Sequence, residues 1–345
     1  CTKDTAFFYF KNGCAKVTEN GAELLPYYKM KKLIWQDQLL DHELELVASD
    51  QPLDSAFDHF LDCIATRYRT ATGKLVEMSH KARLERLAAL RKLIGYLIHN
   101  FTDGEMKAVN LTDSTVSDAD DGRTGKTLLG RACGKMGAYV EIGGKGFSSN
   151  DTFRFQKVQT TTQIVHLNDV DKKFRLEQVY NEISDGYDVN KKGKDLFTVK
   201  AKTILSSNAP LEVNGSSDRG RVIEFEVTNY FSDKYTPPDE FEQIGYQKDY
   251  YLFRDFDKKE WNKFYNSMIA SCYLYLSDGL AEPVNTNLAK RKLKNETSPE
   301  FVEFADVEIK TEVVYFFDEV KANFIKSYPD FEKLSDRKFS AWLDK

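Results

Sequence analysis

The spacing of apolar residues changes its period along the chain. The first fifty residues carry short alternating apolar stretches that are broken by Asn12-Gly13 and Asn20-Gly21, and Asn-Gly between such stretches predicts a hairpin. From Asp54 to about Asn100, leucine and isoleucine recur at steps of three and four residues, which is typical of one helix face. That face carries Leu84, Leu87, Leu90, Ile94, Leu97 and Ile98. We predict a β-rich lead-in followed by a helical subdomain.

Residues 105–228 alternate between strand-like and helix-like patterns. The expected strands are Ala108–Leu111, Ala138–Ile142, Thr162–Leu167, Thr203–Ser207 and Val222–Val227. Strands separated by helices predict an α/β fold with a parallel sheet that is covered on both faces. Ligands of such sheets bind at the carboxyl ends of the strands, so the site is expected there.

The pattern divides the chain into five segments. We expect the lead-in and helical subdomain at 1–104, an α/β core at 105–230, a helical extension at 231–288, a basic linker at 289–300 and a helical C-terminal piece at 301–345. The last piece has two interpretations: a packing helix capped by Ser335 with Phe339, Trp342 and Leu343 inward, or, as the family resemblance named below implies, the first part of a winged helix.

Composition excludes several classes of protein. The net charge of −5 and a pI near 5.7 argue against a protein that coats DNA with its whole surface, but they permit local contacts to nucleic acid. No apolar run approaches the roughly 20 residues of a membrane span. The five cysteines include no Cys-x-x-Cys pair, which excludes a zinc ribbon and a disulfide framework and favours reduced thiols and a cytoplasmic location.

A phosphate-binding loop is the main chemical signal. Gly122-Arg123-Thr124-Gly125-Lys126-Thr127 follows a predicted strand and opens a helix that begins near Leu128. Glycines let backbone N–H groups surround phosphate oxygens, a lysine balances their charge, and a Ser/Thr hydroxyl binds Mg²⁺. The strict pattern requires a glycine where this chain has Asp120, and a solvent-exposed loop is the alternative. We expect Lys126 to contact phosphate and to be dispensable for the fold.

Two further strand ends supply polar groups. Asp169 ends the strand Ile164–Leu167 and suits Mg²⁺ or the attacking water, although it follows Asn168 and not a second acid. Asp171 or Glu182 is the alternative or assisting acid, and a turn-capping aspartate is the structural alternative. Asn208 ends the next strand and is expected to hold the water.

Two basic segments are candidate binding elements. One lies just before the last predicted strand, and the other lies between the two strands described above. Arg219 or Arg221 precedes the last strand and could reach the γ-phosphate of a neighbouring subunit, a contribution on the order of 10³–10⁵ in rate. The segment Gly186–Lys194 contains Lys191, Lys192 and Lys194 beside Gly193 and is typical of a hairpin tip. An isolated lysine run is usually a solvated turn, but between these two strands it favours a loop that grips phosphates. His166, in an apolar strand, is interpreted as a satisfied core residue.

The ordered set of motifs resembles superfamily 3 helicases, the AAA+-like motors of small DNA viruses, phages and plasmids, and above all the helicase portion of phage or prophage primase–helicases. The resemblance covers about residues 85–285. It also rests on Ile94-Gly95-Tyr96-Leu97, on Asn181–Gly186 and on the segment from Asp257 to Phe264.

The resemblance implies roles for the candidate residues. Lys126 and Thr127 would be the Walker A pair, Asp169 the Walker B acid and magnesium ligand, Asn208 the polar sensor, and Arg219 or Arg221 the finger. Lys191, Lys192 and Lys194 would line the central channel. ATP and Mg²⁺ would be the cofactors, and single-stranded DNA and further copies of this chain, as a hexamer, the partners. Travel would be 3′-to-5′, and a primase–polymerase domain could precede Cys1.

Two functions therefore follow from the sequence. The first is an ATP-driven hexameric DNA helicase. The second is a DNA-binding initiator or scaffold that binds ATP only to assemble, and Asp120 and Asn168 favour it because each departs from a hydrolysing site.

Overall fold

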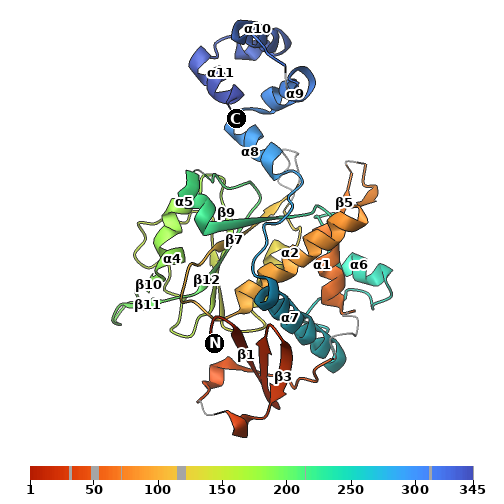
Figure 1. Cartoon of the computed structure of the whole chain (residues 1–345), viewed down its shortest axis with the longest axis vertical. Coiled ribbons are helices and arrows are strands. Elements are labelled where there is room, and N and C mark those ends of the chain that lie inside the picture. The colour runs from red at the N-terminus through yellow and green to blue at the C-terminus, as the bar shows by residue number, and fades with distance from the viewer. Residues whose placement is uncertain are drawn as a thin grey trace. The chain divides into compact units, whose positions relative to one another are not determined.

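The chain folds into two units, Cys1–Val284 and Asn285–Lys345 (Figure 1). The computed structural model describes residues 1–30, 33–47, 54–70, 72–114, 122–213, 215–310 and 313–344. Asp120, the residue that departs from the glycine pattern, lies outside these ranges. No described helix is both long enough and apolar enough to cross a membrane.

The first unit opens with a small sheet in the order β3-β2-β1-β4. Its strands are β1 (Thr5–Phe10), β2 (Gly13–Thr18), β3 (Gly21–Leu25) and the short β4 (Leu39–Leu40), with two 3₁₀ turns before β4. β1 pairs with β2 and β2 with β3 in antiparallel register, with tight turns at the two Asn-Gly dipeptides. The predicted β-rich lead-in is therefore confirmed.

Two helices follow, α1 (Ala56–Thr66) and α2 (His80–Ile98). Ser55 and Ser79 cap them by accepting hydrogen bonds from backbone N–H groups in the first turn. A hairpin of β5 (Arg67–Arg69) and β6 (Leu75–Glu77) lies between them, which the helical period did not predict.

The predicted apolar face of α2 is buried only in the second half of the helix. Leu90, Ile94, Leu97 and Ile98 are buried, whereas Leu84 is 55% exposed. Periodicity identifies a helix face but not how much of that face meets a packing partner, so the prediction for Leu84 was wrong.

The central element is a five-stranded sheet in the order β13-β7-β12-β9-β8, in which every pair is parallel. The strands are β7 (Ala108–Asp113), β8 (Tyr139–Gly143), β9 (Ile164–Val170), β12 (Lys202–Ser207) and β13 (Val222–Val227). All five predicted strands are confirmed, with small differences at their ends.

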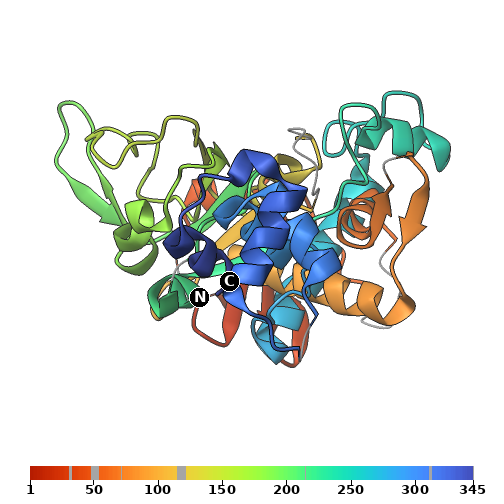
Figure 2. The same ribbon diagram turned by 90° about the horizontal axis from the view of Figure 1, so that it is seen from above.

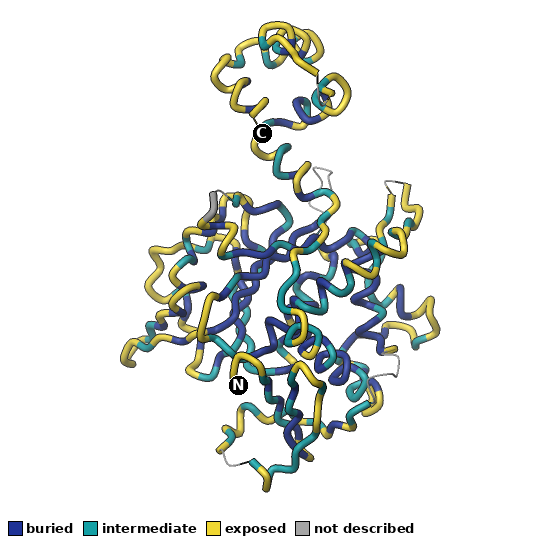
Figure 3. Tube along the Cα trace, in the orientation of Figure 1, coloured by how far each residue is buried: buried dark blue, intermediate teal, exposed yellow. Residues whose placement is uncertain are grey.

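Both faces of this sheet are covered, as predicted. Val109, Ile204 and Phe225 belong to one apolar core, which also holds residues of the N-terminal sheet, α1, α2, α3 (Lys126–Cys133) and α7 (Lys258–Asp278). Val165 and Leu205 face a second core, formed with the segments before and after β9. Figure 3 shows the resulting layer of buried strands.

The motifs around Gly95 and Asp257 serve the packing of α2 and α7. A Cβ atom at Gly95 would lie 2.1 Å from the backbone oxygen of Ser271 in α7, so only glycine allows this close approach. Asp257 caps α7 by accepting from the Glu260 N–H, and the Glu260 carboxylate accepts from the Ala56 N–H at the start of α1. Both motifs therefore have a structural role.

The remaining elements of this unit flank the sheet. They are η3 (Leu176–Val179), α4 (Tyr180–Ser184), β10 (Tyr187–Val189), β11 (Phe197–Val199), α5 (Gly215–Arg221) and α6 (Pro237–Gln243). β10 and β11 pair as an antiparallel hairpin, which confirms the predicted hairpin. It projects from the body of the unit in Figures 1 and 2.

The second unit contains α8 (Leu288–Glu296), α9 (Pro299–Glu308), α10 (Phe317–Ser327), a 3₁₀ turn (Pro329–Phe331) and α11 (Asp336–Leu343). Phe301, Phe324, Phe339 and Trp342 form its core, while Leu343 is 37% exposed. Ser335 caps α11 as predicted. The basic stretch expected to be a linker is the helix α8, because lysine, arginine and leucine are good helix formers.

Candidate functional site

A cavity of about 440 Å³ lies at the carboxyl edge of the parallel sheet. The strands β7, β9 and β12 end beside one another there, and α3 begins at the same edge. Its lining consists of Gly122, Arg123, Thr124, Gly125, Lys126, Thr127, Leu128, Arg131, Asn168, Asp169, Ser206, Asn208 and Pro237. The structure thus brings together all the residues proposed for nucleotide binding, with Asp169 and Asn208.

The loop before α3 has the backbone conformation of a tight turn. Gly125 has φ +104°, and a Cβ there would lie 2.9 Å from the Phe60 ring of α1. Glycine is therefore required at this position for both conformation and space. Arg123 also has a positive φ, +70°, and is exposed.

Lys126 is buried beneath this loop and already has partners. Its Nζ lies 2.5 Å from Asp113 Oδ1 and donates to Asn208 Oδ1 at 3.1 Å. The Thr124 hydroxyl donates to the same Asp113 oxygen at 2.5 Å. These contacts give Lys126 a structural role that the sequence analysis did not expect, because its removal would leave the buried Asp113 carboxylate without its cation.

Asp113 is a site residue that the sequence analysis missed. It is 2% exposed, and its second oxygen, Oδ2, has no hydrogen-bond partner among the described residues. The signal was available, since Asp113 follows the predicted strand Ala108–Leu111 and precedes the glycine loop.

A chain of hydrogen bonds joins Thr127 to a second missed acid, Glu141 in the middle of β8. The Thr127 hydroxyl donates to Asn168 Oδ1 at 2.9 Å, and Asn168 Nδ2 donates to Glu141 Oε1 at 3.0 Å. Arg131 of α3 binds both oxygens of Glu141, at 2.9 and 3.2 Å. Burial alone would raise the pKa of Glu141, but the hydrogen bond and charge of Arg131 bring it below its ordinary value.

Asp169 has different contacts from those of its neighbour Asn168. Its φ of +61° is uncommon for a residue other than glycine. Its carboxylate lies 3.0 Å from the Lys145 ammonium and is 43% exposed, while its backbone N–H donates to Ser206 Oγ. Asp169 therefore offers a solvent-accessible carboxylate at the cavity, and Asn168 offers the group beside Thr127.

The two alternative acids have structural partners and do not line this cavity. Glu182 is buried and pairs with Arg154 at 2.8 Å. Asp171 accepts from the Lys173 N–H at 2.7 Å within its own turn.

His166 behaves as the core residue that was predicted. Its two ring nitrogens meet the Tyr139 hydroxyl at 2.6 Å and Ser206 Oγ at 3.0 Å. Burial lowers the pKa of His166 to about 4, so the ring is neutral near pH 7.

The two candidate arginines lie on α5, outside the described lining of the cavity. Arg221 donates to Ser184 Oγ at 3.2 Å and to Ser217, and it stacks over the Tyr180 ring at 4.7 Å. Arg219 is exposed and makes no hydrogen bond or ion pair with the described residues. Of the two, Arg219 has the side chain available to another molecule.

The hairpin lysines differ in exposure. Lys192 and Lys194 are exposed at the tip, and Gly193 has φ +73° in the turn between them. Lys191 is half-buried, with its ammonium 5.5 Å from the centre of the Phe197 ring.

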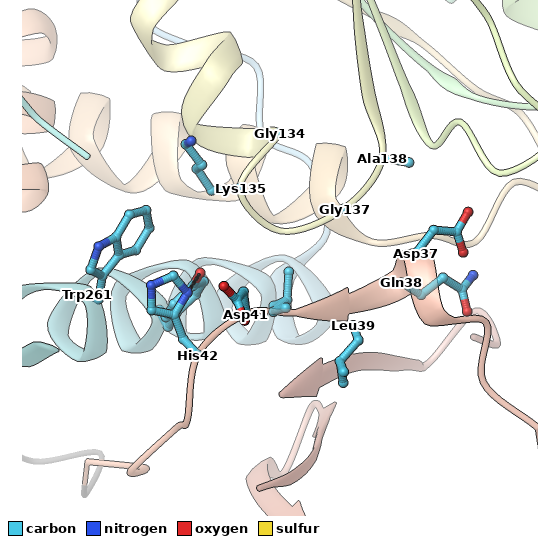
Figure 4. Close-up of a pocket in the computed structure, with 12 residues that line it drawn as sticks. Asp37, Gln38, Leu39, Asp41, His42, Gly134, Lys135, Gly137, Ala138 and Trp261 are labelled. Carbon is cyan, nitrogen blue, oxygen red and sulfur yellow. Dashed lines mark hydrogen bonds between the residues drawn. The ribbon is translucent and has the colours of Figure 1, made fainter. Parts of the chain in front are cut away.

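A second cavity, of about 330 Å³, lies where β4 and the residues after it approach α7 and the loop after α3 (Figure 4). His42 stacks on Trp261 with ring centres 4.4 Å apart, and its Nδ1 meets the Tyr265 hydroxyl at 2.9 Å. Burial lowers the pKa of His42. Asp41, which also lines this cavity, is paired with Lys11. The lining mixes aromatic rings with the polar and charged side chains of Asp37, Gln38 and Lys135.

These features define an α/β protein whose parallel sheet holds a loop, a buried lysine and a helix N-terminus at its carboxyl edge. No family model matches the chain, and no curated protein sequence is recognisably similar to it.

Among solved structures, the A form of the apo C-terminal region of NrS-1 (residues 305–718) is a distant structural neighbour. Its sequence is 14% identical, the match covers 92% of this chain and 82% of that one, and the TM-score is 0.34.

Proposed function

We propose that this chain is an ATP-dependent DNA helicase of the AAA+-like superfamily 3 type, which acts as a ring-shaped hexamer on single-stranded DNA. The observation that carries the proposal is the cavity at the end of the parallel sheet, where Lys126 and Thr127 begin a helix directly after a tight glycine turn. Helix N-termini with such loops bind phosphate through backbone N–H groups and the helix dipole.

The residues of the cavity fit a magnesium–triphosphate group. Lys126 now lies against oxygen atoms of Asp113, Asn208 and Thr124, and phosphate oxygens would replace some of these. The Thr127 hydroxyl and the Asp169 carboxylate are oxygen donors of the kind Mg²⁺ prefers. When bound, Mg²⁺ would neutralise charge that develops on the phosphates.

The chain's own groups then divide the work of hydrolysis. Asp169 would accept the proton of the attacking water, and Asn208 would orient that water from the end of β12. Arg131 and Glu141 would hold Asn168 against Thr127. Arg219 would reach the γ-phosphate of the neighbouring subunit, and Lys192 and Lys194 would contact DNA phosphates in the channel.

One observation favours the second candidate, an ATP-binding initiator or scaffold. The group beside Thr127 is the neutral Asn168, and an amide holds a divalent cation less strongly than a carboxylate does. Such a site could bind nucleotide and turn it over slowly.

A strand-separation assay distinguishes the two candidates. The parent chain is incubated with a labelled forked duplex and either ATP or a non-hydrolysable analogue. The helicase proposal predicts strand separation with ATP and no strand separation with the analogue. Assembly on DNA with both nucleotides, without strand separation, would support the scaffold and overturn the helicase.

A further inference from the structure

Three side chains with different donor atoms converge between α1 and α6. His59 and Cys63 lie one turn apart on α1, and Glu240 lies on α6, nearly two hundred residues away in the sequence. Among the described residues, this is the one group of histidine, cysteine and acidic side chains whose donor atoms all lie within 4.8 Å of one another. Figures 1 and 2 both show α1 and α6 side by side.

The spacing of the three donor atoms is close to that of a tetrahedral metal site. His59 Nε2 is 2.6 Å from Glu240 Oε1, and Cys63 Sγ is 3.5 Å from the same nitrogen and 3.8 Å from the same oxygen. Ligand bonds of about 2.0–2.3 Å place tetrahedral ligand atoms roughly 3.3–3.7 Å apart. The 3.5 Å distance lies within this range and the 3.8 Å distance lies just above it, whereas the 2.6 Å distance requires Glu240 and His59 to move apart.

The surroundings of Glu240 resemble the outer shell of a metal ligand. Its other oxygen, Oε2, accepts hydrogen bonds from the hydroxyls of Tyr230 and Tyr235, both at 2.5 Å. Such bonds hold a ligand carboxylate in one orientation.

The local charges also accommodate a divalent cation. Arg67 Nη1 is 4.0 Å from Glu240 Oε1, but this guanidinium pairs more closely with Asp62, at 2.9 Å. A Cys63 thiolate and the Glu240 carboxylate together would balance a charge of +2. Binding of the metal by the Cys63 thiolate would release the proton of the thiol.

We propose that His59, Cys63 and Glu240 form a zinc site that joins α1 to α6. Mixed nitrogen, sulfur and oxygen donors in tetrahedral geometry select Zn²⁺ over Mg²⁺ and Ca²⁺. The side chain of His59 is 24% exposed, so a water molecule can supply the fourth ligand.

The site has a clear structural consequence. Phe60 and Ile64, on the same helix as His59 and Cys63, lie against Gly125 of the loop, and Pro237 of α6 lines the nucleotide cavity. Zinc would therefore fix two helices that flank this cavity. The proposal does not depend on ATP hydrolysis, because metal binding is measured without nucleotide.

The test begins with the parent chain, stripped with a chelator and dialysed against Zn²⁺ or Co²⁺. We expect about one zinc ion per chain, and with Co²⁺ a thiolate-to-metal charge-transfer band in the near ultraviolet. Zinc absent from the parent chain, or cobalt bound without that band, would overturn the proposal without any variant.

Variants then assign the ligands. Cys63→Ser should lose the charge-transfer band and the retained zinc, whereas Cys272→Ser, at an equally buried cysteine that belongs to no such group, should keep both. Tyr235→Phe should weaken zinc affinity about 10–100-fold while it keeps the three ligands. A band that survives Cys63→Ser and disappears with Cys272→Ser would place the metal elsewhere and contradict the assignment.

Discussion

Lys126 has a structural and a chemical role at the same position. Its ammonium and the Asp113 carboxylate are both buried, with side chains 8% and 3% exposed. Lys126→Ala should therefore reduce the free energy of unfolding by about 3 kcal/mol, because it leaves an uncompensated buried charge. Urea unfolding measures the loss.

A double variant separates the two roles of this lysine. Adding Asp113→Asn to Lys126→Ala removes the orphaned charge, so it should restore most of the stability while ATP turnover stays absent. Unfolding of Lys126→Ala at the parental urea concentration would contradict the buried pair that the structure shows.

Asp169 is the acid to test first for hydrolysis, since Asp171 and Glu182 do not line the cavity. Asp169→Asn keeps the shape and deletes the charge, so nucleotide binding should persist and turnover should fall on the order of 10²–10⁴. Steady-state phosphate release and equilibrium ATP binding measure the two effects, with Asp171→Asn as the matched control. Parental turnover in Asp169→Asn would turn attention to Glu141.

At the scale of elements, the hairpin of β10 and β11 carries the proposed DNA-binding lysines. Lys192 and Lys194 are exposed at its tip, whereas Lys191 packs on Phe197. Lys192→Ala with Lys194→Ala should weaken binding of single-stranded DNA and reduce its salt dependence. The slope of log affinity against log salt concentration should become shallower by roughly 0.7 for each DNA phosphate that is no longer neutralised by a lysine. Basal ATP hydrolysis without DNA should persist.

The control for the hairpin variant removes the same charge elsewhere. Lys248→Ala with Lys259→Ala changes two exposed lysines of the 231–288 segment. Salt titrations of DNA binding should separate the two double variants. An equal loss of affinity in both would mean that net charge, and not the hairpin, governs DNA binding.

The sheet was predictable from the sequence because its strands are short segments rich in apolar and β-branched residues and bounded by polar turns, as in Val222–Val227. The hairpin of β5 and β6 was missed because its few residues lie between two strongly helical segments. The glycine loop, Asp169 and Asn208 were found because strand ends are visible in sequence. Asp113 could have been found in the same way, since it ends β7, but Glu141 could not, because it lies within β8 and its partners Arg131 and Asn168 come from other elements.

At the scale of the whole molecule, a ring would place the finger and the nucleotide loop in different chains. Arg219 lies outside the cavity lining of its own chain and is exposed. A mixture of Arg219→Ala with the Lys126→Ala, Asp113→Asn double variant should regain ATP turnover. In a head-to-tail ring mixed at random in equal amounts, about a quarter of the interfaces would pair an intact arginine with an intact loop.

Arg221→Ala is the matched comparison for the mixing experiment. Its guanidinium is engaged with Ser184 and Ser217, so this variant should lose stability and show less rescue than Arg219→Ala. If mixed oligomers form and no ratio restores turnover, Arg219 does not act across a subunit boundary.

The proposed function couples ATP hydrolysis at the sheet edge to single-stranded DNA. The most direct test is the steady-state rate of ATP hydrolysis by the parent chain, measured with and without single-stranded DNA. The Lys126→Ala, Asp113→Asn double variant is measured under the same conditions as the control. We predict that the parent chain hydrolyses ATP without DNA and that its rate rises several-fold when DNA is added. The double variant should hydrolyse no ATP with or without DNA. A parental rate that DNA leaves unchanged would contradict the proposed function. ATP hydrolysis by the double variant would contradict it as well.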